Sequence, residues 1–200
     1  MRIIIDPSKP KPRIVKKVAD VLSSGGIIVY PTDTVYGLGC SISNRKGIEK
    51  INTIKKSKKP KSIMLADLKS ISYYAKVSNM AYRVIRSLLP GPYTIVLPAT
   101  REVPRLLQSR RKSVGIRIPD HWFCTSLVSE LGEPVITTTI PLPSGGTHID
   151  PLEIEHELGH LVDVVVDGGI LPDLPSTVIS VEDDKVEILR EGLGKFPLIE

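Results

Sequence analysis

Residues 25–39, which read GGIIVYPTDTVYGLG, constrain the fold more than any other stretch of the chain. The two glycines at the start end a predicted helix, and the four apolar residues after them are typical of a buried strand. Pro31 offers no N–H to a sheet ladder, so the strand is expected to stop there. The pattern therefore predicts a helix, a buried strand and a polar turn in that order.

Three short polar side chains, Thr32, Asp33 and Thr34, directly follow this strand. In α/β proteins, ligands bind beyond the carboxyl ends of strands. Gly37 and Gly39 leave backbone that a ligand could approach closely. We therefore take this turn as the first candidate site, with an ordinary strand and polar turn as the alternative.

Helical and strand patterns alternate over the first two-thirds of the chain, and strands cluster after them. Helices are expected at residues 13–24, 47–56, 78–89, 102–109, 120–131 and 151–160, with Asp120 capping the fifth and Pro104 in the first turn of the fourth. Further strands are expected at 62–66, 93–97, 113–118, 134–139, 161–166, 177–181 and 186–189, after a short strand at the N-terminus. The alternation predicts one α/β domain over residues 1–200, with α+β character and a mixed sheet covered by helices.

Composition narrows the class of protein. A chain of 200 residues, 41% hydrophobic and 24% charged, is typical of a soluble globular domain. Its net charge of +5 favours polyanionic partners without establishing nucleic-acid binding. Because Cys40 and Cys124 are the only cysteines and no segment is long enough to span a bilayer, we expect a reduced, cytoplasmic protein without membrane contact.

One short motif suggests zinc. His156 and His160 flank Glu157 in an H-E-x-x-H pattern, which holds zinc when both histidines lie on one long helix. Here the predicted helix is short and Gly159 weakens it. A chance match is the favoured interpretation, and no zinc or other metal site is expected.

Arginines within strands indicate anion binding. Arg117 lies between Ile116 and Ile118, where an unpaired cation would be costly, so it needs a buried carboxylate or an anionic ligand. Arg190 ends the last predicted strand and raises the same question, with the neighbouring Glu191 as an alternative partner. A basic loop at residues 55–61 offers further cations for phosphates, although such loops are usually only solvated.

Five blocks together resemble the YrdC-like family, in family order and across nearly the whole chain. They are GGIIVYPTDTVYGLG (25–39), LPGPYT (89–94), VGIRIP (114–119), PSTVI (175–179) and LREG (189–192). The resemblance implies a twisted mixed sheet with helices on its faces and a large basic cavity. It also implies binding of ATP, L-threonine and RNA-like ligands, with magnesium accompanying ATP as substrate.

Family enzymes make L-threonylcarbamoyladenylate from L-threonine, bicarbonate and ATP for the threonylcarbamoyladenosine modification of tRNA. Carried over by position, threonine would be held by Thr32, Arg117 and Ser176. The nucleotide would be contacted by Lys55, Ser113, Thr139 and Arg190. The resemblance places Lys55 and Arg117 at the catalytic step.

The chain departs from the synthase pattern at two places. The K-x-R motif of the synthases reads Lys55-Lys56-Ser57 here, without its arginine, and the S-x-N motif reads Thr139-Ile140-Pro141, without its asparagine. Both departures resemble the YciO branch of the family. Two functions therefore stay open: a threonylcarbamoyladenylate synthase, or a non-catalytic protein that binds double-stranded RNA in the same cavity.

Overall fold

The computed structural model describes residues 1–6, 8–56, 61–107, 112–140 and 147–196. The helices are α1 (Pro12–Ser23), α2 (Arg45–Ile54), α3 (Ile71–Tyr74), α4 (Asn79–Leu88), α5 (Trp122–Leu131) and α6 (Pro151–Leu158). The strands are β1 (Arg2–Ile4), β2 (Ile28–Tyr30), β3 (Gly37–Ser41), β4 (Ser62–Met64), β5 (Tyr93–Pro98), β6 (Ser113–Arg117), β7 (Val135–Thr139), β8 (Val164–Asp167), β9 (Thr177–Glu182) and β10 (Lys185–Arg190). Within these ranges, no helix is both long enough and apolar enough to traverse a bilayer.

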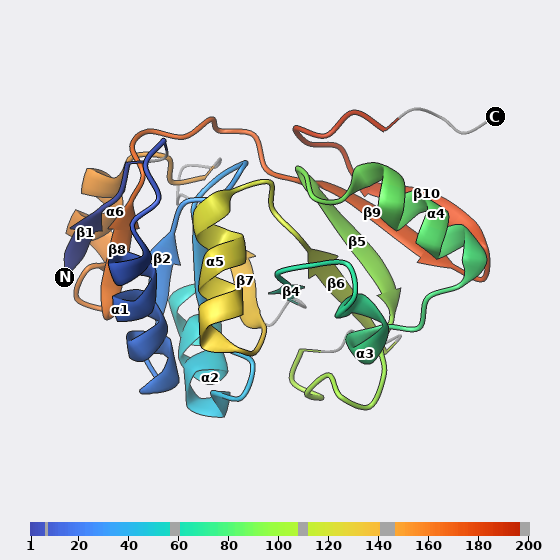
Figure 1. The fold of residues 1–200 in the computed structure, drawn as a ribbon, viewed down its shortest axis with the longest axis horizontal. Coiled ribbons are helices and arrows are strands. Elements are labelled where there is room, and N and C mark those ends of the chain that lie inside the picture. Colours follow the sequence, from blue (N-terminus) through green and yellow to red (C-terminus); the bar gives the residue numbers. More distant parts are fainter. Residues whose placement is uncertain (7, 57–60, 108–111, 141–146, 197–200) are drawn as a thin grey trace.

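All the named strands join one ten-stranded sheet in the order β1-β8-β2-β3-β7-β4-β6-β5-β9-β10 (Figure 1). Strand β8 runs parallel to β1 and β2, β4 to β6, and β5 to β9, while the other neighbours are antiparallel. The predicted mixed sheet is confirmed.

The two faces of the sheet carry separate cores, because successive side chains of a strand point to opposite faces. Val29 of β2 belongs to a core that includes residues of α2, α4 and α6. Ile28 and Tyr30, its neighbours along the strand, belong to a core formed with α1 and α5. Helices α1 and α5 lie side by side in front of β2 and β7 in Figure 1.

The face covered by α1 and α5 is only partly filled. Among the described residues, the core beneath these two helices contains no residue of β5, β6, β9 or β10. On β6, Val114 and Ile116 point into the opposite core. The alternate residues Ser113, Gly115 and Arg117 therefore face the side that neither helix covers, and a cavity lies there.

Strand β3 corrects the expectation of an open, glycine-lined turn. Gly37 and Gly39 lie in β3, which pairs with β2 on one side and β7 on the other. A Cβ at Gly37 would lie 2.9 Å from the Tyr30 ring, and one at Gly39 would lie 2.2 Å from the carbonyl oxygen of Ile136. These glycines make room for neighbouring parts of the chain and not for a ligand.

Two helix predictions also need correction. Residues 101–107 form turns instead of the expected helix, and the N–H of Leu107 donates to the carbonyl oxygen of Pro104 at 2.9 Å. Pro104 has no N–H to donate, so it favours such a turn over a helix interior. The N-cap of α5 is His121 rather than Asp120, and it makes no side-chain capping bond. The helix expected at residues 78–89 is confirmed as α4, and Ser78 caps it by accepting a hydrogen bond from the N–H of Ala81.

Candidate functional site

A cavity of about 390 Å³ lies over β4–β7 and β9–β10, on the sheet face that α1 and α5 leave uncovered. Its wall combines cations, hydroxyl groups and a few apolar side chains, and none of its described lining residues is a carboxylate. The lining residues are Lys55, Lys61, Ser62, Thr94, Val96, Ser113, Gly115, Arg117, Thr137, Thr138, Thr139, Ser176, Val178, Leu189 and Arg190. Such a surface suits an anionic ligand that also offers hydrogen-bond acceptors.

Arg117 lines the cavity and is contacted by Asp33 and Thr34, which are not among its described lining residues; we call these three residues the Arg117 wall. The Nη2 atom of Arg117 donates to Asp33 Oδ1 at 2.9 Å and to Thr34 Oγ1 at 3.1 Å. The side chains of Arg117 and Asp33 are each only 8% exposed. Asp33 is thus the buried carboxylate that the sequence left as one of two possible partners for this strand arginine.

Thr32 lies behind this wall and is not among the described lining residues of the cavity. Its hydroxyl donates to the carbonyl oxygen of Val35 at 2.7 Å and accepts from the N–H of Thr34 at 3.1 Å. The same hydroxyl lies 3.1 Å from Thr34 Oγ1, which in turn contacts Arg117. Thr32 therefore shapes the turn that supports Arg117, and its expected contact with threonine stays a prediction.

A second part of the lining is the Arg190 wall, formed by Arg190, Ser176 and Thr94. Nη2 and Nε of Arg190 donate to the carbonyl oxygen of Ser176 at 2.7 and 3.2 Å. The Ser176 hydroxyl lies 3.3 Å from Arg190 Nη2 and 2.9 Å from Thr94 Oγ1. Among the described residues no carboxylate pairs with Arg190, not even Glu191. Burial, and then the like charge of Arg117, lower the pKa of Arg190.

Two lysines reach the cavity from the α2 side. Lys55 caps the C-terminus of α2, and its Nζ donates to Thr138 Oγ1 at 2.5 Å. Lys61 precedes β4, is 6% exposed and donates to Asn52 Oδ1. Burial lowers the pKa of Lys61. Sequence reasoning treated Lys61 only as part of a basic loop; its place directly before a buried strand was the available signal that it points inward.

The structure brings together six of the seven predicted ligand residues. Lys55, Ser113, Arg117, Thr139, Ser176 and Arg190 line one cavity, and Thr32 stands next to it. Their individual roles stay predictions. Of the two departures from the synthase motifs, Ser57 and Pro141 both lie outside the described residues.

The histidine motif does not form a paired helical site. Helix α6 ends at Leu158, so it carries His156 but not His160. Both histidines are exposed, and within the described part of the chain no three His, Cys, Asp or Glu residues are grouped to hold a metal ion.

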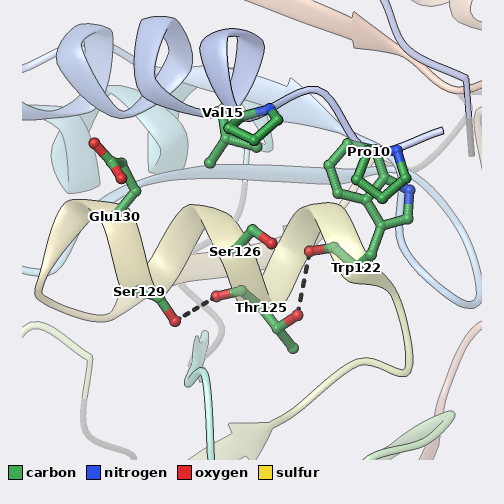
Figure 2. A pocket seen from close by; sticks show the side chains of 8 residues that line it. Pro10, Val15, Trp122, Thr125, Ser126, Ser129 and Glu130 are labelled. Carbon is green, nitrogen blue, oxygen red and sulfur yellow. Dashed lines mark hydrogen bonds between the residues drawn. The ribbon is translucent and has the colours of Figure 1, made fainter.

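A second hollow, of about 390 Å³, lies between the start of α1 and one side of α5 (Figure 2). Its polar side chains are mostly hydroxyls, and those of Thr125 and Ser129 donate to carbonyl oxygens of their own helix. Glu130 is the charged residue that lines it, and none of its described lining residues is a cation. This groove has the same volume as the cavity, but it lacks the described cations that would bind an anion.

Fold, cavity and sequence blocks together define a class of protein. The chain belongs to the Sua5/YciO/YrdC family, whose model, described as "Telomere recombination", matches residues 20–192. Within this family it lies in the YciO branch. It is 40% identical to the protein YciO of Escherichia coli over 194 residues, which cover 95% of this chain and 94% of that protein.

A solved structure and an enzyme extend the comparison. The crystal structure of E. coli YciO matches with a TM-score of 0.93 and 37% identity, covering 98% of this chain and 97% of the other. A threonylcarbamoyl-AMP synthase of Vibrio vulnificus is 32% identical over 184 residues, covering 88% of this chain and 97% of the enzyme. The expected family, branch and twisted mixed fold are confirmed.

Proposed function

We propose that this protein binds ATP and L-threonine in the cavity and makes L-threonylcarbamoyladenylate from ATP, L-threonine and bicarbonate, for the modification of tRNA. The observation that carries the proposal is the unbalanced charge of Arg190. Among the described residues its guanidinium donates only to the neutral oxygens of Ser176, and partial burial of this group, followed by the like charge of Arg117, lowers the pKa of Arg190. A phosphate group at this wall would supply the missing negative charge.

In this proposal the residues act by positioning and by stabilising charge. The amine of threonine combines with bicarbonate to give a carbamate and water, and a carbamate oxygen then attacks the α-phosphorus of ATP as pyrophosphate leaves. Arg190 and Lys55 hold the phosphates and stabilise charge on the departing pyrophosphate. Arg117 and Ser176 hold threonine, with Arg117 on its carboxylate.

Magnesium is proposed to enter with the phosphates of ATP rather than as a resident ion. Mg²⁺ prefers carboxylate, water and phosphate oxygens. No carboxylate is found among the described lining residues of the cavity, so the protein itself offers few ligands there. When bound, the ion would neutralise part of the phosphate charge.

The test is pyrophosphate release from purified protein. Release should need ATP, L-threonine and bicarbonate together, and omission of any one should abolish it. Arg190→Ala should bind ATP more weakly and release less pyrophosphate. Binding of ATP and threonine with no pyrophosphate under any condition would refute the synthase activity.

The alternative function, RNA binding without turnover, is favoured by the net charge of +5 and by the missing motif arginine at Ser57. Affinity for double-stranded RNA that falls steeply with salt, in a protein that binds neither ATP nor threonine, would support that alternative.

A further inference from the structure

The ion pair between Asp33 and Arg117 is not arranged as one optimised for stability alone. A carboxylate pairs best with an arginine through two parallel hydrogen bonds. Here one nitrogen, Nη2, makes both contacts of the guanidinium, to Asp33 and to Thr34. The Nε atom of Arg117 is buried and has no hydrogen-bond partner among the described residues. Since an unsatisfied buried donor costs stability, the stability of the ion pair alone does not account for this orientation.

Asp33 is itself held in place by the backbone. Its Oδ2 atom accepts a hydrogen bond from the N–H of Asp120 at 3.0 Å, while Oδ1 binds Arg117. One carboxylate therefore joins the turn after β2 to the segment after β6, which are not neighbours in the sheet. Because both oxygens are engaged and the side chain is buried, Asp33 has little freedom to move with its partner.

We propose that Asp33 is a positioning residue for ligand binding: it holds the Arg117 guanidinium by one nitrogen against the wall and so fixes how the rest of that group faces the ligand. The inference rests on the proposed function, because it treats Arg117 as a ligand-binding residue. Asp33 also balances the charge of Arg117. The Arg117 wall then suits an amino-acid zwitterion of zero net charge, and the Arg190 wall suits the phosphates.

Asp33→Asn is the first test, because it keeps the size of the side chain and an oxygen for the N–H of Asp120 but removes the charge. Calorimetry should show at least a tenfold loss of affinity for L-threonine and less than a threefold change for ATP. Asp33→Glu, which restores the charge, should recover part of the threonine affinity. If Asp33 had a purely structural role, the substitution would lower the affinities for L-threonine and ATP by similar factors, and that result would overturn the inference.

Asp163→Asn is the matched control. Asp163 also accepts a backbone hydrogen bond, from the N–H of Ile27 at 2.8 Å, and makes no ion pair among the described residues. It lies outside the cavity. The control should bind threonine and ATP as the unmodified protein does, which separates loss of the Arg117 contact from the general effect of removing an aspartate.

A second measurement needs no ligand. In ¹⁵N–¹H NMR spectra, the Nε–H of an immobilised, buried arginine gives a distinct signal that exchanges slowly with water. We expect such a signal for Arg117 and its loss in Asp33→Asn, with the backbone amide spectrum retained. If the signal persists unchanged in Asp33→Asn, Asp33 does not position Arg117.

The two measurements separate failure of the inference from failure of the proposed function. If the unmodified protein does not bind threonine, the proposed function fails, and the Arg117 signal still decides whether Asp33 fixes the guanidinium. If the unmodified protein binds threonine and Asp33→Asn binds it as tightly, the inference fails while the proposed function stands.

Discussion

The Arg117 wall and the Arg190 wall present the same functional group in opposite electrostatic settings. At the Arg117 wall the guanidinium faces a buried carboxylate 2.9 Å away. At the Arg190 wall the guanidinium hydrogen-bonds, among the described residues, only to the carbonyl and hydroxyl oxygens of Ser176. Burial alone does not explain the contrast, because Arg117 is the more buried of the two.

This contrast shows that an arginine paired with a buried carboxylate contributes differently to folding and to ligand binding than an arginine with neutral partners. A buried charge with a partner is costly to break, since removal of one member leaves the other uncompensated. A cation with only neutral partners adds little to folding and is available to an incoming anion. We therefore expect substitutions at the Arg117 wall to affect stability most and substitutions at the Arg190 wall to affect nucleotide binding most.

The largest effect is expected for Arg117→Ala. Because Asp33 would be left buried without its counter-charge, the free energy of unfolding should fall by about 3–5 kcal/mol. Urea denaturation measures it. The double variant Arg117→Ala/Asp33→Ala should recover part of the loss, since it removes both charges. A single-variant loss below about 1 kcal/mol would break the comparison, because the pair would then not be the structural one.

Next in size is Arg190→Ala. Loss of a charge-assisted contact of about 1.5–3 kcal/mol should weaken ATP binding by roughly tenfold to more than a hundredfold. The free energy of unfolding should change by less than about 1 kcal/mol, because no charge partner is stranded. Calorimetry and urea denaturation test the two parts. Arg83→Ala, at an exposed position on α4, is the matched arginine control and should leave ATP affinity unchanged.

A smaller, pH-dependent effect is expected for Lys61. Burial lowers the pKa of this side chain in the folded protein below its ordinary value of 10.5, so the unfolded chain binds more protons in the interval between the two values. The contribution of Lys61 to stability should therefore rise with pH through that interval and level off above it. The measurement is the difference in unfolding free energy between the unmodified protein and Lys61→Met, followed from neutral to alkaline pH.

A matched control for that measurement is Lys50→Met, which removes an exposed lysine of α2. Its difference from the unmodified protein should stay nearly flat over the same pH range. A Lys61→Met difference that is equally flat would show that the charge of Lys61 is no harder to keep in the folded protein than in the unfolded chain.

The smallest effect is expected in the groove between α1 and α5. Ser126→Ala should change neither ATP nor threonine affinity by more than about twofold, because this groove has no described cation to receive an anion. Calorimetry of ATP and threonine binding to this variant tests whether the effects on affinity are confined to substitutions in the cavity. A clear loss of ATP affinity would show that the nucleotide occupies the groove instead.

The sequence predicted the need for an anion at Arg117 but not its source. The flanking residues Ile116 and Ile118 made the arginine a strand residue in an apolar setting, and that local pattern was sufficient. Asp33 is far from Arg117 in the chain, and β2 and β6 are separated by three strands of the sheet. No local sequence pattern predicts the contact between Asp33 and Arg117, so it becomes visible only in the arrangement of the strands.

Strand β3 is a case in which the local sequence pattern predicted the wrong element. The sequence Gly37-Leu38-Gly39-Cys40-Ser41 has two glycines in five residues, which weakens any local preference for a strand. Its pairing with β2 and β7, and the close approach of Tyr30 and Ile136, stabilise it instead. A local pattern that was typical of a loop therefore gave the wrong element, because tertiary contacts decided the outcome.

The strand order has a consequence for biosynthesis. β5 pairs with β9, and β9 with β10, so the strand that carries Arg190 joins the sheet only after about 190 residues have left the ribosome. Until β9 has emerged, one edge of β5 lacks its partner and is a template for misassociation with other chains. A nascent chain that has paired β1 with β8 still lacks the Arg190 wall, so the cavity is complete only when β10 has paired with β9.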